Sequence, residues 1–225
     1  MARWVNLGQS LKVNAKRFPD TIALKERGRA FTYPETNRRV NRLAHALLSL
    51  GLGKGDKVGV VLENCIEIVE VYLASAKTGL VIVPINFRLL GPEVEYIVTN
   101  SDAQALIVHD EFTACVDAIR PALTKIEPEN YIVVGSERAG YREYESFVRE
   151  APECEPETKV EPVEAWNLMY TSGTSGVPKG VVGCHEAHIA FYLVNADDFG
   201  VNEHDRWLEV LALCHRSGTV WTGPL

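Results

Sequence analysis

Apolar residues are grouped along the chain in two ways, at helical spacing in some segments and in short continuous runs in others. Over residues 40–48 they fall at i, i+3, i+4, i+7 and i+8, which is one buried face of a helix. Thr32 and Glu35 have the spacing of a capping box at the start of that helix, and Gly51 follows its end. Before it, residues 21–33 carry the turn signals of a β-hairpin.

The short apolar runs have the length of buried strands, and they alternate with further amphipathic helices. The expected strands are at 56–62, 80–86, 103–109 and 130–135. Asn64 and Glu67 have the spacing of a cap on the helix after the first strand, and Gly79 ends that helix. Strands that are apolar throughout and alternate with helices indicate a mostly parallel sheet with helices on both faces. We therefore expect an α/β fold.

The pattern breaks over residues 151–165, which contain three prolines and five glutamates and show no periodicity. Such a composition is typical of a solvated linker. We expect a first α/β subdomain over 1–150 and the start of a second, incomplete one over 166–225. The elements expected in the second part are a strand at 166–170, a return strand and helix over 180–194, and a strand at 206–215.

Composition and charge narrow the class of protein. Hydrophobic residues make up 46% of the chain and charged residues 24%, which is ordinary for a globular protein with a core. The net charge of −7 disfavours nucleic acid or an anionic membrane as a partner. No apolar run approaches the roughly 18 residues of a membrane-spanning helix, and the first residues lack the pattern of a signal peptide. We expect a cytoplasmic protein without a transmembrane segment.

Cysteine and histidine side chains are the usual protein ligands of zinc. The five cysteines are spread along the chain without a CxxC pair, which argues against a disulfide framework and against a thiolate zinc site. Cys184 and His188 are four residues apart and could share a helix face with His185 nearby. Only three ligands are in sight there, so we expect no metal site built by the chain itself.

The segment "YTSGTSGVPKG", Tyr170 to Gly180, directly follows an expected strand and concentrates glycines and hydroxyls. Such a loop offers backbone N–H groups and hydroxyls to an anion, and Lys179 adds a positive charge. A flexible surface loop is the simpler alternative, but eleven residues of this composition in this place favour a nucleotide's phosphate tail. The Walker pattern does not apply, because Lys179 is followed by glycine rather than by the Ser or Thr that binds magnesium.

A second glycine-rich stretch, "GLGKGD" at residues 51–56, mimics a dinucleotide-binding motif. It follows a helix and precedes a strand, which is the reverse of the order that motif requires. These glycines are therefore interpreted as a helix stop and a turn.

The stretch "YTSGTSGVPKGVV" resembles the signature of the adenylate-forming enzymes, which include acyl-CoA synthetases, luciferases and the adenylation domains of peptide synthetases. It matches the Tyr-Thr-Ser-Gly-Thr-(Thr/Ser)-Gly-x-Pro-Lys-Gly pattern at every defining position. Residues 31–64 and 71–89 also resemble that family's first helices and strands. The likeness covers nearly the whole chain and corresponds to the N-terminal portion of the family's large domain.

The resemblance implies a chemistry as well as a fold. Such enzymes use ATP and Mg²⁺ to convert a carboxylic acid into an acyl-adenylate and pyrophosphate, and the thiol of coenzyme A then takes the acyl group. The loop would neutralise and orient the β- and γ-phosphates. The resemblance also implies that Lys179 is a catalytic residue, which contacts the phosphates. The implied phosphate-binding residues are Thr171, Ser172, Gly173, Thr174, Ser175, Gly176 and Lys179.

A second motif, "LALCHRSG" at residues 211–218, resembles the family's Leu-Pro-Leu-aromatic-His pattern followed by a small residue and glycine. The resemblance places His215 at the rim of the acyl pocket, near the reacting carboxylate, as a second catalytic residue. Ala212 replaces the proline and Cys214 the aromatic residue, which leaves the identity of the acyl group open. A half-buried histidine with a structural partner is the alternative for His215.

Family members continue well beyond the histidine motif, into the adenine pocket, the ribose-binding acid, the hinge and a C-terminal domain. We therefore expect a fragment of an ATP-dependent acyl-CoA ligase, which needs the missing C-terminal part of the same enzyme for activity. A peptide-synthetase adenylation domain and a naturally short, non-catalytic protein that binds a nucleotide or a partner both stay open. Lipid-type and aromatic acids stay open as substrates. We also expect exposed strand edges and an apolar face near the strand at 206–215, and hence poor solubility.

Overall fold

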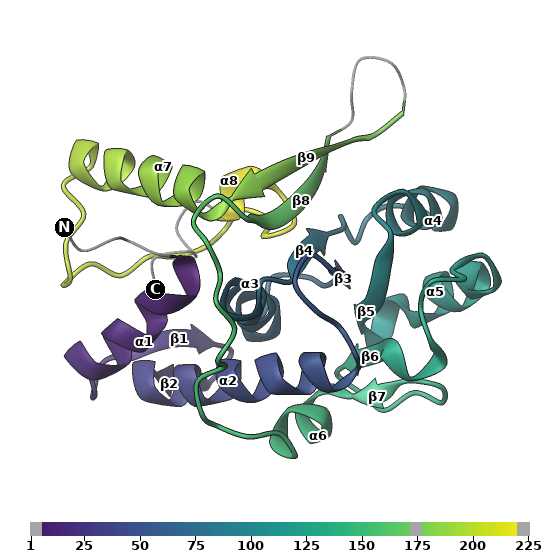
Figure 1. Ribbon diagram of the computed structural model, residues 1–225, viewed down its shortest axis with the longest axis horizontal. Coiled ribbons are helices and arrows are strands. Elements are labelled where there is room, and N and C mark those ends of the chain that lie inside the picture. The colour runs from purple at the N-terminus through teal and green to yellow at the C-terminus, as the bar shows by residue number, and fades with distance from the viewer. Residues whose placement is uncertain (1–5, 172–176, 220–225) are drawn as a thin grey trace.

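A single seven-stranded sheet forms the centre of the molecule in the computed structural model, which describes residues 6–171 and 177–219 (Figure 1). Its strands, in spatial order, are β7 (Arg142–Glu143), β6 (Tyr131–Val134), β5 (Ala103–His109), β3 (Lys57–Val61), β4 (Val81–Pro84), β8 (Ala165–Thr171) and β9 (Lys179–Cys184). All neighbouring strands run parallel except β9, which is antiparallel to β8. The expected α/β fold with a mostly parallel sheet is confirmed.

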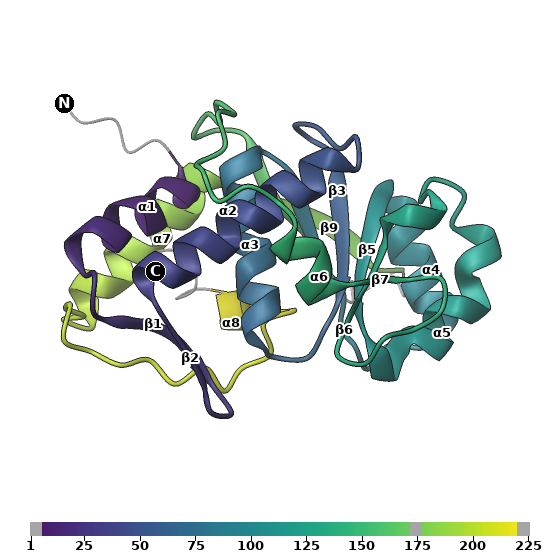
Figure 2. The same cartoon turned by 90° about the horizontal axis from the view of Figure 1, so that it is seen from below.

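Helices cover both faces of this sheet (Figure 2). On one face lie α1 (Leu7–Arg17), α2 (Tyr33–Ser49), α3 (Ile66–Thr78) and α6 (Tyr144–Arg149), and on the other α4 (Gly91–Asn100) and α5 (Thr113–Ile119). Two further helices, α7 (His185–Asp198) and α8 (Arg216–Thr219), follow β9 in sequence. Short 3-10 helices span Asp110–Phe112, Arg120–Ala122 and Pro128–Asn130. None of the helices in the described ranges has the length and apolar character needed to cross a membrane.

The first hairpin and the helix after it form as the sequence predicts. Strands β1 (Ile22–Glu26) and β2 (Arg29–Thr32) pair antiparallel around a turn in which Arg27 and Gly28 have positive φ angles of 42° and 89°. Thr32 Oγ1 accepts a hydrogen bond from the Glu35 backbone, and the Glu35 carboxylate accepts one from Thr32 N at 2.8 Å. This reciprocal capping box starts α2.

The predicted cap on α3 is wrong in one respect. Cys65, and not Asn64, is the N-cap residue, and its side chain makes no capping hydrogen bond. The carboxamide of Asn64 instead binds the backbone of residues 211 and 213, almost 150 positions away. A tertiary partner therefore outcompetes the local cap. Gly79 ends α3 with a left-handed φ of 75°, as expected.

Residues 151–164, all of them described, form neither helix nor strand, as predicted, but they are not simply solvated. Glu155 accepts a hydrogen bond from Lys77 Nζ at 2.8 Å, and Glu164 accepts one from Lys54 Nζ at 2.6 Å. Val160 is 3% exposed. With Glu153, which pairs with Arg42, three of the five glutamates in this segment thus have a specific partner on the first half of the chain. The proposed division at 1–150 and 166–225 stays a prediction, and β8 joins the same sheet as β4 through Ile82 and Asn167.

The strand predicted at 206–215 is wrong. Residues 206–210 have no regular secondary structure, and the side chains of Trp207, Leu208 and Val210 are 60%, 79% and 74% exposed. The apolar pattern is that of a strand, but no neighbouring strand in the described ranges offers hydrogen bonds to this segment. The segment ends in a turn that leads into α8.

Candidate active site at the carboxyl edge of the sheet

The phosphate-loop motif begins and ends on a pair of neighbouring strands. Thr171, the last residue of β8, lies opposite Lys179, the first residue of β9, as an antiparallel pair. Their Cα atoms are therefore about 5 Å apart. The loop residues Ser172, Gly173, Thr174, Ser175 and Gly176 lie outside the described residues. Pairing between β8 and β9 continues beyond the point where β4 ends, so Thr171 and Lys179 stand at the carboxyl edge of the sheet (Figure 1).

Thr171 and Lys179 are both exposed. The ammonium of Lys179 makes no ion pair with any residue of the ranges 6–171 and 177–219, so its charge faces solvent. Gly180 follows it because two side chains of β8 cross β9 at this point. A Cβ at Gly180 would lie 2.9 Å from Leu168 Cδ1 and 3.3 Å from Tyr170 Cζ. The glycine after the lysine thus has a packing role in the hairpin.

Helix α4 holds both arms of this hairpin. Tyr96 Oη donates a hydrogen bond to the carbonyl of Pro178 at 3.2 Å, and Tyr170 Oη donates one to Asn100 Oδ1 at 2.7 Å. The two tyrosine rings meet edge to face with centroids 6.4 Å apart. Burial raises the pKa of Tyr170 to about 12, so its hydroxyl keeps its proton and remains a donor. The base of the loop is therefore anchored to a rigid helix.

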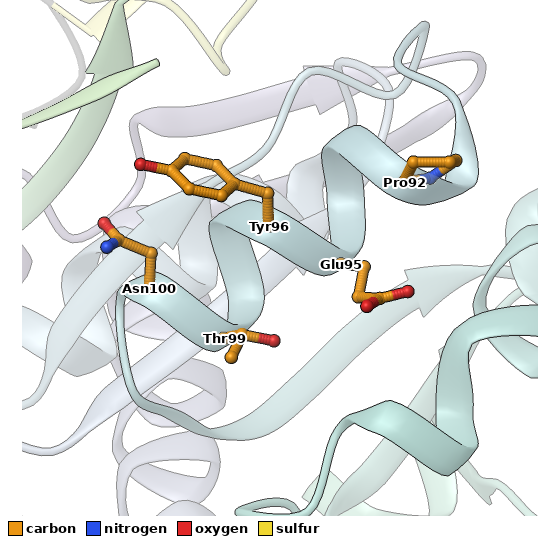
Figure 3. A pocket seen from close by; sticks show the side chains of 5 residues that line it. All are labelled: Pro92, Glu95, Tyr96, Thr99 and Asn100. Atoms are coloured by element: carbon orange, nitrogen blue, oxygen red, sulfur yellow. The ribbon is translucent and has the colours of Figure 1, made fainter. Parts of the chain in front are cut away.

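A shallow hollow of about 340 Å³ lies on the same helix (Figure 3). Its lining residues are Pro92, Glu95, Tyr96, Thr99 and Asn100. Tyr96 and Asn100 point to one side of α4, and Glu95 and Thr99 point to the other (Figure 3). Two of the lining residues, Tyr96 and Asn100, bind Pro178 and Tyr170 of the hairpin. The lining includes no cation, so this hollow is itself unsuited to phosphate.

The histidine motif lies in the turn before α8. His215 N donates to the Ala212 carbonyl at 2.9 Å, and the imidazole is exposed. No hydrogen bond from that imidazole to another described residue is present. Leu213 and Cys214, by contrast, are 3% and 6% exposed. The backbone around His215 is thus held by the core, while its side chain is exposed.

His185 and His188 are core residues. His188 is 4% exposed, meets Trp166 edge to face at 4.5 Å, and has the guanidinium of Arg216 at 2.7 Å from Nε2. Burial, helped by the Arg216 charge, lowers the pKa of His188 to about 3. Burial lowers the pKa of His185 to about 4, and its Nδ1 accepts a hydrogen bond from Leu7 N at 3.3 Å. Both imidazoles are neutral near pH 7.

Within residues 6–171 and 177–219 there is no group of three side chains placed to bind a metal ion. Cys184, His185 and His188 do not form one, because the two histidines pack around Trp166 instead.

The sequence did not predict the supporting roles of three residues, Asn64 (expected only as a helix cap), Tyr96 and Asn100. Asn64 follows the carboxyl end of β3, which is the edge of a parallel sheet where ligand-binding side chains gather. Tyr96 and Asn100 share one face of α4 at a spacing of four. The spacing of these residues can be seen in the sequence, but the residues to which they hydrogen-bond are distant in sequence and are known only from the structure.

Comparison with known proteins assigns the chain to a family. Residues 11–225 match the family described as AMP-binding enzyme. The chain belongs to that family. It is 35% identical over 184 residues to the fatty acid–[acyl-carrier-protein] ligase ScoC of Streptomyces coeruleorubidus, a match that covers 82% of this chain and 34% of ScoC. It is 33% identical over 214 residues to the long-chain-fatty-acid–CoA ligase FadD13 of Mycobacterium tuberculosis, covering 93% and 41%. The chain thus spans between about a third and two fifths of the length of these curated relatives.

Solved structures show the same fold. The inhibitor-bound N-terminal domain of FACL13 from Mycobacterium tuberculosis superposes with a TM-score of 0.90 at 31% identity, over 98% of this chain and 54% of that chain. The o-succinylbenzoate coenzyme A synthetase MenE from Bacillus subtilis, solved with ATP and magnesium ion, superposes with a TM-score of 0.78 at 26% identity, over 96% and 53%. Both are larger than the part matched here.

Proposed function

We propose that this chain is the phosphate-binding part of an ATP-dependent acyl-CoA ligase. The observation that carries the proposal is the hairpin that pairs Thr171 with Lys179 in a member of the AMP-binding family. The reaction would activate a carboxylic acid as its acyl-adenylate and then transfer the acyl group to a thiol.

In the first step, a carboxylate oxygen attacks the α-phosphorus of ATP, and the bond to pyrophosphate breaks. The leaving group gains negative charge, which Lys179 and the backbone N–H groups of the loop would stabilise. The cradle would comprise Thr171, Ser172–Gly176 and Lys179. His215 would stand beside the reacting carboxylate. Mg²⁺ would enter with ATP and take most of its ligands from the phosphates and water.

The names of the relatives favour a lipid-type acid and leave two thiols to consider. FadD13 is a long-chain-fatty-acid–CoA ligase, and a relative from Rhodococcus rhodochrous that is 36% identical is a 3-oxocholest-4-en-26-oate–CoA ligase. We propose a fatty acid as the substrate and coenzyme A as the acceptor. The similarity to ScoC favours an acyl-carrier-protein thiol as the second candidate.

We further propose that residues outside the matched third of the relatives complete the site, and that the enzyme works in the cytoplasm. The 225-residue chain alone should then bind ATP weakly and have no turnover.

The test is carboxylate-dependent exchange of pyrophosphate into ATP, measured on the native protein purified from its cell. Lys179→Ala should lower the exchange rate by about 100-fold, the typical loss when one donor to a developing anion is removed. Lys16→Ala, an exposed lysine on α1, is the matched control and should leave the rate unchanged. An exchange rate that Lys179→Ala leaves unchanged would contradict the proposal. Exchange by the isolated 225-residue chain would contradict the expectation that this chain alone has no turnover.

A further inference from the structure

The segment before His215, residues 211–213, is hydrogen-bonded to the side chain of Asn64, which lies almost 150 positions earlier in the sequence. Asn64 Oδ1 accepts a hydrogen bond from Leu213 N at 2.8 Å, and Asn64 Nδ2 donates one to the Leu211 carbonyl at 2.8 Å. A carboxamide can accept from a backbone N–H and donate to a backbone carbonyl at the same time, as a neighbouring strand would. Asn64 therefore substitutes for a strand partner at the point where the predicted strand does not form.

Tyr72 on α3 binds the same segment from inside the core. Its side chain is fully buried, and Tyr72 Oη donates a hydrogen bond to the Leu213 carbonyl at 2.8 Å. Both backbone groups of Leu213 are thus satisfied by side chains of the first half of the chain. The Leu213 side chain is 3% exposed and packs in the main hydrophobic cluster.

This attachment extends to His215 through a tight turn. His215 N donates to the Ala212 carbonyl at 2.9 Å, and Gly218 N donates to the His215 carbonyl at 3.1 Å. His215 thus follows Leu213 by two residues, and its backbone is hydrogen-bonded to Ala212 within the segment that Asn64 binds. Residues 206–210, just before residues 211–213, have no regular secondary structure and are mostly exposed. Asn64 and Tyr72 therefore hold the chain on the N-terminal side of His215, while Arg216, on its other side, contacts His188.

We propose that Asn64 and Tyr72 are positioning residues, which place His215 at the carboxyl edge of the sheet for the activation of the carboxylate. The inference rests on the proposed function. Asn64 follows β3 and Thr171 ends β8, and both strands end at the same edge of the sheet. The hydrogen bonds from Asn64 and Tyr72 to residues 211–213 therefore attach the histidine segment to the edge of the sheet that carries the β8–β9 hairpin.

The first test measures placement and needs no activity. In the native protein, hydrogen exchange at the Leu213 amide should be at least about ten times faster in Asn64→Ala than in the unmodified protein, because the amide loses its acceptor. The nuclear magnetic resonance signal of the His215 ring should shift in both Asn64→Ala and Tyr72→Phe. Tyr72→Phe keeps the aromatic packing against Trp166 and loses only the hydroxyl.

Asn130→Ala is the matched control. Asn130 Nδ2 donates to the Gln104 carbonyl at 2.9 Å near the start of β5, at the opposite edge of the sheet, so its loss should not alter the His215 signal. An unchanged Leu213 exchange rate in Asn64→Ala, or an unchanged His215 signal in Tyr72→Phe, would overturn the inference.

The second test separates positioning from general stability. In the native protein, Asn64→Ala should lower kcat for carboxylate-dependent exchange at least about tenfold and leave the KM for ATP within about twofold, because ATP's phosphates meet a different element. Added to His215→Ala, it should cause no further loss, since it acts through that histidine. If the losses from Asn64→Ala and His215→Ala multiply in the double variant, the inference is overturned but the proposed function is not. Absence of exchange in the unmodified native protein would overturn the proposed function and the catalytic purpose of these hydrogen bonds with it.

Discussion

Gly218 shows how closely the backbone packs around the histidine segment. A Cβ at this position would lie 2.5 Å from the Ala212 carbonyl oxygen and 3.0 Å from that of Leu211. The Leu211 carbonyl also accepts the hydrogen bond from Asn64, so it cannot move away from a side chain at residue 218 without weakening that bond. The glycine of the family motif therefore has a steric reason that is visible only in the folded chain.

Gly218→Ala should destabilise the protein by about 1–3 kcal/mol, because backbone atoms must move to admit the methyl group. The free energy of unfolding from urea titration measures this. Gly53→Ala is the control, since a Cβ there would meet its nearest neighbour, Asp56 Oδ2, at an ordinary 3.9 Å. Equal stability of the two variants would contradict the steric account.

His185 and His188 make stability depend on pH. Burial lowers their pKa values to about 4 and about 3, below the value of about 6.5 in an unfolded chain. The unfolded state therefore binds more protons between these values. Their contribution is fully present above pH 6.5 and is lost as the pH falls toward the folded pKa. Burial lowers the pKa of His109 as well, which acts in the same direction.

We expect the free energy of unfolding to fall by about 2 kcal/mol for each of His185 and His188 between pH 6.5 and pH 5. Urea titrations at several pH values in this window measure the slope. His188→Gln should reduce the slope, whatever its effect at pH 7. A His188→Gln curve parallel to that of the unmodified protein would mean that folding does not change the pKa of His188.

At the scale of elements, local patterns predicted most helices and strands correctly. The hairpin, the capping box on α2 and the apolar strands of the first half depend on residues close in sequence, so their signals are complete in a short window. The cap at Asn64 and the strand at 206–215 were wrong for the opposite reason. Each depends on partners far away, which the local pattern does not contain.

The acidic segment 151–164 is the element whose role changed most. Lys77 is 6% exposed, and its ammonium contacts the side-chain oxygens of Asn37, Asn41 and Glu155 at 2.6, 2.7 and 2.8 Å. Burial lowers the pKa of Lys77, and Glu155 is the anion that opposes this shift. The segment is thus attached across α2 and α3 before β8 begins.

Glu155→Ala should destabilise the protein by about 1–3 kcal/mol, because it leaves a buried ammonium without its counter-charge. Glu157→Ala, an exposed position in the same segment, should stay within about 0.5 kcal/mol of the unmodified chain. Thermal unfolding followed by circular dichroism compares the two. A Glu155→Ala variant as stable as Glu157→Ala would mean that the segment is held by its apolar contacts alone.

Large apolar side chains are exposed on several elements of the second half of the described chain. Besides the 207–211 segment, α7 exposes Phe191, Leu193 and Val194, and the outer edge strand β9 exposes Val181 and Val182. Exposed apolar side chains on neighbouring elements, next to an unpaired strand edge, favour association. The net charge of −7 opposes it only in part.

We therefore expect the 225-residue chain to self-associate, with a mean mass by light scattering that rises with concentration. The double variant Leu208→Asn and Val210→Thr should shift the mean mass toward the 25.0 kDa monomer, because both side chains are largely exposed and removing them costs little in the core. Val160→Asn would be unsuitable as a comparison, since that residue is buried. A monodisperse monomer for the unmodified chain would contradict the expectation.

The sequence by itself determined the α/β class, most elements and the phosphate-loop motif, because each is written in contiguous residues. Only the tertiary structure decided that Thr171 faces Lys179 at the carboxyl edge, that His185 and His188 are core residues, and that the acidic segment is attached. It also decided that Asn64 clasps the histidine segment. These features join residues up to about 150 positions apart, and chain folding alone brings such residues together.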